Sequence, residues 1–155
     1  MSNNEMGKSI YESVCSTLDR MDLKYNRHDD DLVIHLGYRG DDLNHDLLII
    51  VNPKQEVIQF VERLPITVDT EKAIDIALAV CLVNDSILIG EFTYGLGKDL
   101  EYKINHAYTG SLVGEDTIER MIRTIAFTVE EYDDKFLALN KGYIQFSDFV
   151  KKEEE

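Results

Sequence analysis

The amino-acid sequence predicts an α+β protein, in which helices pack on a single antiparallel sheet of about five strands in the order αβββαββα. Two long segments, one near each end of the chain, repeat apolar residues at helical spacing. Between them lie segments that alternate apolar and polar residues or are continuously apolar, as strands do. The connections between these strands are too short for parallel crossovers, which favours an antiparallel arrangement.

The first half of the chain predicts one helix and three strands. Apolar residues three or four positions apart indicate a helix over residues 4–23. Residues 32–39 alternate apolar and polar side chains, which is typical of a strand with one buried face. Residues 47–51 are apolar on both faces, as a central strand would be, and residues 57–63 form the third strand of an antiparallel meander.

The second half predicts a helix, two strands and a long helix. Asp69 or Thr70 is placed to cap a helix in which Asp75 is the only charged residue between positions 73 and 83. Such an apolar helix is expected to be covered on most sides, by its own sheet or by a second subunit. Strands are expected over 87–94 and 100–108, joined by a hairpin loop at 95–99. A long helix follows from about residue 115 and stops at Gly142.

Length and composition predict one domain over residues 1–142 and a C-terminal tail over 143–155. The tail is too apolar for a plain disordered end, so we expect it to dock as a short helix with a frayed, charged terminus. Cys15 and Cys81 fall on apolar stripes of predicted helices and are interpreted as reduced core residues. With no signal-peptide pattern at the N-terminus, the expected compartment is the cytoplasm.

The charge balance limits the classes of partner. The chain has 16 Lys and Arg against 30 Asp and Glu, a formal net charge of -14. Binding nucleic acid requires clustered basic residues, and an anionic membrane attracts basic amphipathic segments, so we expect neither partner. The negative charge is compatible with a basic polypeptide as the partner. Solubility alone is also a sufficient reason for the acidic excess.

No reaction motif stands out. The four histidines, His28, His35, His45 and His106, show none of the paired spacings of a zinc site. There is no Gly-x-Ser-x-Gly elbow, and Gly95-Leu96-Gly97 joins two strands where a dinucleotide-binding loop would open a helix. We therefore expect no metal, no cofactor and no enzyme. The remaining alternative is an enzyme whose site combines dispersed acids with His106 or His35.

Several segments resemble one known family. They are residues 47–51 before a hairpin, Leu64-Pro65 before the second helix, residues 79–84 at the end of that helix, residues 90–94 after it, and residues 131–142 closing the third helix. In these segments and in the element order, residues 8–142 resemble the YbjN-like family of bacterial proteins, which looks like the type III secretion chaperones in fold.

The resemblance implies a small acidic cytoplasmic protein that is homodimeric and binds another polypeptide without catalysing a reaction. A chaperone of this kind would hold an extended client segment on hydrophobic surface, with main-chain pairing at an edge strand. Ile58, Phe60, Ile89 and Phe92 are the predicted protein-binding residues. A second hypothesis is a signalling or stress-response regulator that binds a small ligand.

Overall fold

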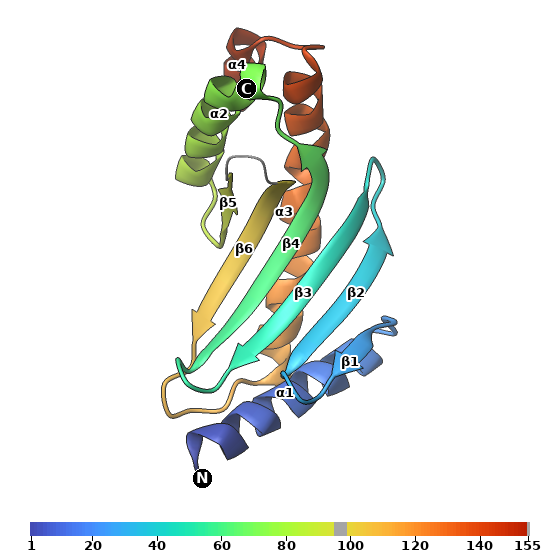
Figure 1. Ribbon diagram of the computed structural model, residues 1–155, viewed down its shortest axis with the longest axis vertical. Helices are drawn as coiled ribbons and strands as arrows, with labels where there is room; N and C mark the ends of the chain where they lie inside the picture. The colour runs from blue at the N-terminus through green and yellow to red at the C-terminus, as the bar shows by residue number, and fades with distance from the viewer. Residues whose placement is uncertain (95–98, 155) are drawn as a thin grey trace.

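The computed structural model describes residues 1–94 and 99–154 of the chain. It confirms the α+β class and the single antiparallel sheet, with six strands where about five were predicted, in the order β1-β2-β3-β4-β6-β5 (Figure 1). The elements are α1 (Asn3–Arg20), β1 (Asn26–His28), β2 (Val33–Arg39), β3 (Asn44–Asn52), β4 (Val57–Thr67), the 3-10 helix η1 (Thr70–Lys72), α2 (Ala73–Ser86), β5 (Glu91–Thr93), β6 (Asp99–Ala107), α3 (Glu115–Lys141) and α4 (Phe146–Glu154).

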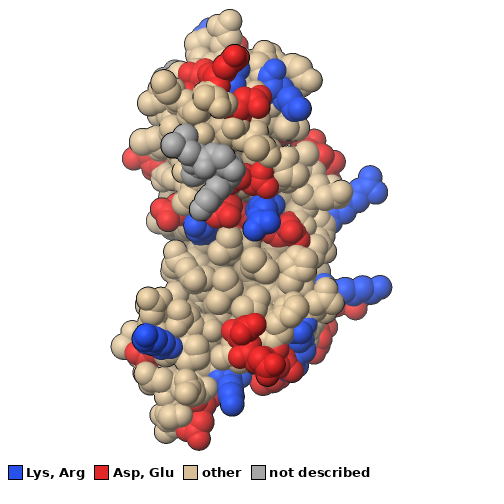
Figure 2. All heavy atoms as spheres, viewed as in Figure 1, with Lys and Arg blue, Asp and Glu red and all other residues tan. Residues whose placement is uncertain are grey.

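The helices cover one face of the sheet and leave the other uncovered. α3 and α1 lie behind the strands in Figure 1, and α2 and α4 pack at one end, beside the C-terminal part of α3. No helix within residues 1–94 or 99–154 lies over the front face. Figure 2 shows that face, with an uncharged band at the centre of the view and charged side chains gathered toward the two ends.

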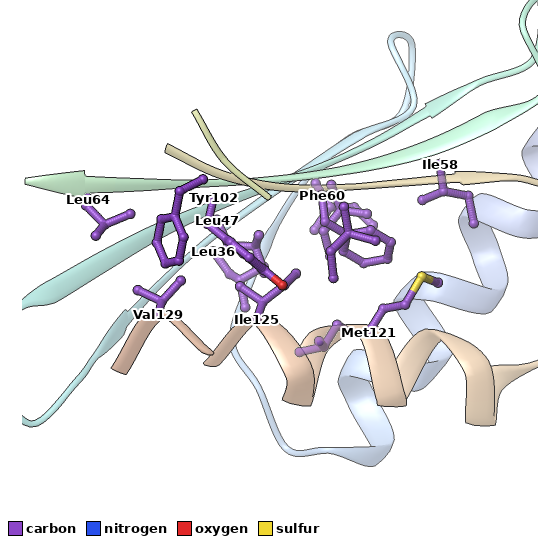
Figure 3. Close-up of a cluster of buried hydrophobic side chains, with 14 of the residues drawn as sticks. Leu36, Leu47, Ile58, Phe60, Leu64, Tyr102, Met121, Ile125 and Val129 are labelled. Carbon is purple, nitrogen blue, oxygen red and sulfur yellow. The ribbon is translucent and has the colours of Figure 1, made fainter. Parts of the chain in front are cut away.

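Alternation along the strands builds the core. Every second residue of β3 and β4 faces α3 and is buried, including Leu47 and Phe60. Figure 3 shows these two side chains between the sheet and the Ile125 and Val129 side chains of α3. The intervening residues point to the uncovered face, where Leu48 is half-buried.

Local backbone geometry sets the ends of the two long helices. Ser2 caps α1 through a capping box with Glu5. The helix ends at Arg20, three residues earlier than predicted, and Asp22 takes a positive φ of 56° that no α-helix continues through. Gly142, with φ 77°, ends α3 at the predicted position.

The second predicted helix is the least accurately predicted of the helices. A 3-10 turn precedes α2, and the Asp69 side chain makes no capping hydrogen bond. α2 buries only Ile76, Ala79 and Val83, so much of its surface is exposed to solvent. Cys81 is among the exposed residues, which corrects its assignment to the core, whereas Cys15 is buried as predicted.

The strand predicted over 87–94 is shortened to β5, residues 91–93. Gly90 has a positive φ of 77° and packs against Tyr102, whose hydroxyl donates a hydrogen bond to the Ile89 carbonyl. These contacts turn the chain away from β6 before residue 91. Asn84 anchors β5, because its side chain accepts a hydrogen bond from the Phe92 N–H and donates one to the Phe92 carbonyl. Of the predicted hairpin loop, residues 95–98 lie outside the described part of the chain.

β1 is the additional strand. It pairs with the start of β2 in the register Asn26↔His35 to His28↔Val33. All its residues are exposed, so it carries no hydrophobic alternation that a sequence pattern could reveal.

The C-terminal residues form α4. Phe149 is buried against Phe136 of α3, with ring centroids 5.6 Å apart. Within the described residues, none of the helices combines the length and apolar character needed to cross a membrane.

Candidate functional site

The four predicted binding residues do not form one surface. Ile58, Phe60 and Phe92 are buried in the core, so the prediction that they meet a partner is corrected. Strand residues point alternately to opposite faces, and these three occupy the inward positions. Their neighbours Val57 and Val61 point to the uncovered face instead.

Ile89 is the exception, because it lines a surface groove. The groove has a volume of about 670 Å³ and lies between residues 88–91, β6 and α3. Leu88, at 94% exposure, stands beside it, and Met121 contributes an apolar side chain from α3. Lys103, His106 and Arg120 add basic or titratable groups to the lining.

The groove follows an unpaired strand edge. β6 pairs with β4 along residues 101–107, but β5 pairs only with residues 101–103 on the other side. The outer edge of β6 at 104–107 therefore has no strand partner among the described residues. Ile104, Asn105 and His106 of this edge all line the groove. Backbone groups at such an edge are free to pair with an added strand.

The second constellation is a buried histidine among carboxylates. His45 of β3 and Glu62 of β4 occupy inward strand positions, and the two side chains come within 3.2 Å at Nδ1 and Oε1. On the other side of the ring, Nε2 lies 3.3 Å from Asp133 Oδ2 and 3.6 Å from Glu130 Oε2. Tyr38, opposite His45 in the β2–β3 register, stacks its ring on the imidazole at 5.1 Å.

Main-chain donors hold the two carboxylates of α3. The Asp41 N–H donates to Glu130 Oε1, and the Asp134 N–H donates to Asp133 Oδ1 at 2.6 Å. In each case the other oxygen is the one near His45 Nε2. Gly40 lies over this point, because a Cβ there would come 2.6 Å from His45 Nε2.

The cluster shifts the ionisation of its members. Burial raises the pKa of Glu62, and it raises the pKa of Asp133 to about 6. Burial alone would lower the pKa of His45, but the Glu62, Asp133 and Glu130 carboxylates together hold it above its ordinary value. The site therefore favours a positive charge at its centre.

A family comparison matches most of the chain. The model of the YbjN family, described as "Putative bacterial sensory transduction regulator", matches residues 11–138. The chain belongs to the YbjN family. This confirms the resemblance inferred from the sequence.

One solved structure has the YbjN-family fold seen here. "Crystal structure of YbjN, a putative transcription regulator from E. coli" superposes with a TM-score of 0.62 at 14% sequence identity. The match covers 80% of this chain and 91% of that one. At this identity the likeness shows the fold alone. No curated protein matches the chain.

Sequence reasoning missed the cluster of this YbjN-family chain, although a signal was present. Glu62 stands at a position of the predicted strand 57–63 where alternation predicts an apolar residue, whereas His45 precedes the predicted strand 47–51 and Asp133 follows Tyr132 of the apolar stripe of α3. A polar residue on a buried face needs a compensating group, and the packing places Glu62 and Asp133 on either side of the His45 ring. The two histidines considered for catalysis lie elsewhere: His35 contacts Asp46 at 2.6 Å on the uncovered face, and His106 lines the groove.

Proposed function

We propose that this YbjN-family protein is a non-enzymatic regulatory module that binds an extended segment of another polypeptide in the groove beside β6. The observation that carries the proposal is the unpaired edge of β6 at residues 104–107, of which residues 104–106 line that groove. A bound segment would add a strand beside residues 104–107 and continue the line of β5. Main-chain hydrogen bonds would supply affinity, as in other cases of strand addition.

Side chains along the groove select the segment. Leu88, Ile89 and Met121 offer apolar contact. Arg120 makes no ion pair with any described residue, and Lys103 stands nearby on β6. Lys103 is paired with Glu101 at 3.3 Å, and Glu91 also lines the groove, so Arg120 is the basic side chain of the lining that is left for an acidic group. We expect a segment that pairs an apolar side chain with a nearby acidic one.

The test uses peptides that the full-length protein selects from a random library displayed on phage. Leu88→Asp and Arg120→Glu change exposed groove side chains, so the fold should persist while peptide affinity falls about tenfold or more, ~1.4 kcal/mol. Tyr143→Asp, at a residue that is 80% exposed and lies outside both the groove and α2, is the matched control and should leave affinity unchanged. Peptide binding should also slow amide hydrogen exchange at residues 104–107.

Equal affinities in all three variants, or protection confined to another strand, would show that the groove is not the binding site.

A regulator of small ligands is the second candidate, because a volume of about 670 Å³ also suits a small molecule. Two results together would favour the small-ligand regulator: no peptide is selected from the library, and a metabolite raises the melting temperature of the wild-type protein but not of the Arg120→Glu protein.

We also propose a homodimer formed through α2. Ile74, Leu78 and Leu82 lie four residues apart on one face of this helix and are 76%, 48% and 40% exposed. No Lys or Arg lies within α2 to break the stripe. Sedimentation equilibrium at micromolar concentration should show a dimer that Leu78→Asp dissociates and Leu88→Asp preserves. A monomeric wild-type protein would exclude this dimer.

The proposed compartment is the cytoplasm. Both cysteines are free, and Cys81 is exposed to solvent. An exposed free thiol is stable in a reducing compartment and prone to oxidation outside it. Cell fractionation with an antibody against the native protein tests this assignment.

A further inference from the structure

The buried cluster around His45 contains polar atoms that the protein itself does not satisfy. His45 Nε2 and Asp133 Oδ2 are buried and have no hydrogen-bond partner among the described residues, and the same holds for His45 Nδ1 and both carboxylate oxygens of Glu62. The His45 and Asp133 side chains are fully withdrawn from solvent, and Glu130 is 27% exposed beside them. Buried polar atoms are normally paired, so a pair of this kind calls for a ligand.

The spacing of these atoms matches a metal coordination sphere. Zinc binds nitrogen and carboxylate oxygen at about 2.0–2.2 Å, so two ligand atoms on a tetrahedron lie roughly 3.3–3.6 Å apart. His45 Nε2 lies 3.3 Å from Asp133 Oδ2 and 3.6 Å from Glu130 Oε2. The three atoms all lie within 4.8 Å of one another.

The supporting contacts orient each donor. The N–H groups of Asp41 and Asp134 hold one oxygen of each carboxylate and leave the other directed at the shared centre. Glu62 Oε1 lies 3.2 Å from the opposite ring nitrogen of His45, although the two atoms do not meet hydrogen-bond geometry. Many zinc sites have a carboxylate behind the ligating histidine that orients the ring and increases its basicity, and Glu62 stands in that place.

The carboxylates of the cluster and the space beside them both favour a bound cation. Glu62, Glu130 and Asp133 place three carboxyl groups around one imidazole, and a divalent cation would neutralise two of them. Gly40 keeps the point above the donors clear of a side chain.

We propose that His45 Nε2, Glu130 Oε2 and Asp133 Oδ2 bind a divalent transition-metal cation, for which Zn²⁺ is the best fit. An imidazole nitrogen with two carboxylates suits zinc and its neighbours, whereas Mg²⁺ and Ca²⁺ prefer sites made only of oxygen. The proposal is independent of peptide binding in the groove.

The test titrates the full-length protein with Zn²⁺ by calorimetry after chelator treatment. The protein carries Cys81→Ser and no histidine tag, because an exposed thiol or a tag would bind zinc by itself. We expect one Zn²⁺ per chain. Asp133→Asn removes one donor and preserves shape, and it should weaken binding about tenfold or more. Glu131→Gln changes the exposed neighbour on α3 and should leave binding unchanged.

A second readout reports the histidine directly. Zn²⁺ should shift the ring ¹⁵N resonances of His45 and spare those of His28, and excess Mg²⁺ should not reverse the shift. If Asp133→Asn fails to fold, Glu130→Gln replaces it, because that side chain is partly exposed. Absence of saturable binding, equal affinity in the Asp133→Asn and Glu131→Gln proteins, or an unchanged His45 resonance would overturn the proposal.

Discussion

Asp133 Oδ2 lies 3.3 Å from His45 Nε2, and both side chains are completely buried between the sheet and α3. The two residues are far apart in the sequence, so their contact depends on the packing of α3 across the strands. The imidazole stands between this carboxylate and Glu62, whose Oε1 lies 3.2 Å from His45 Nδ1. The stability of the fold should therefore depend on His45.

Replacing His45 by Leu in metal-free protein should destabilise the fold by about 3–5 kcal/mol, because Glu62 and Asp133 would be left buried without a compensating group. The double variant His45→Leu/Glu62→Leu should regain part of that loss, since an apolar pair replaces an uncompensated carboxylate. Urea unfolding followed by circular dichroism measures both. Additive losses in the double variant would contradict coupling between these residues.

Gly40→Ala should destabilise the protein by about 1–3 kcal/mol through overpacking. Its Cβ would lie 2.6 Å from His45 Nε2 and would also press on Glu130 Oε2. Gly37→Ala is the control, because the nearest atom to its Cβ is 3.6 Å away. That change should be neutral or slightly stabilising in a strand. Thermal unfolding compares the two, and equal melting temperatures would refute the close approach.

Phe149→Ala should destabilise the protein by about 3 kcal/mol, because it uncovers Phe136 and opens a cavity beneath α4. Tyr143→Ala, at 80% exposure, is the control and should change little.

Removing residues 143–155 tests the predicted domain boundary. The shortened chain should still unfold cooperatively, with a loss comparable to that of Phe149→Ala, and an unfolded product would place the tail within the domain.

Glu119 should give the fold a salt-dependent stability at neutral pH that is lost in acid. The hydrogen bond from Arg123, together with the contact with Arg20 of α1, holds the pKa of Glu119 below its ordinary value of 4.5. Because the folded pKa is the lower one, the contact stabilises the fold above pH 4.5 and is lost as pH falls through the folded pKa.

Glu119→Gln should therefore flatten the fall in melting temperature between neutral pH and pH 3, and added salt should reduce the difference between the two proteins. Glu131→Gln, on the same helix, serves as the control. An unchanged acid profile in Glu119→Gln would show that the contact between α1 and α3 adds nothing in solution.

The outline of the fold could be predicted because it follows from periodicity. The stripe from Ile118 to Leu139 predicts α3, and alternation along residues 32–39 predicts β2, since each pattern reflects one buried face. The pattern fails where burial does not decide the structure. β1 is fully exposed, and β5 begins only at Glu91 because of contacts made by Gly90, Asn84 and Tyr102.

The candidate sites were less predictable for the same reason. Alternation shows that Ile58 and Phe60 share a face, but their partner-binding assignment required knowing which face α3 covers. Ile89 lies in the groove only because the chain turns away from β6 before residue 91. His45, which has no neighbouring partner in the sequence, acquires its carboxylates from β4 and α3.

The amino-acid order alone specifies the α+β class, the family, the two long helices and the central strands, because burial imposes local periods that the residues must follow. Packing in three dimensions sets which apolar residues are exposed and which polar residues meet. The exposed stripe of α2, the unpaired edge of β6 and the contact of His45 with Asp133 each join or separate elements distant in the chain. A local sequence pattern does not reveal these features, because they are set by the packing of whole helices on the sheet.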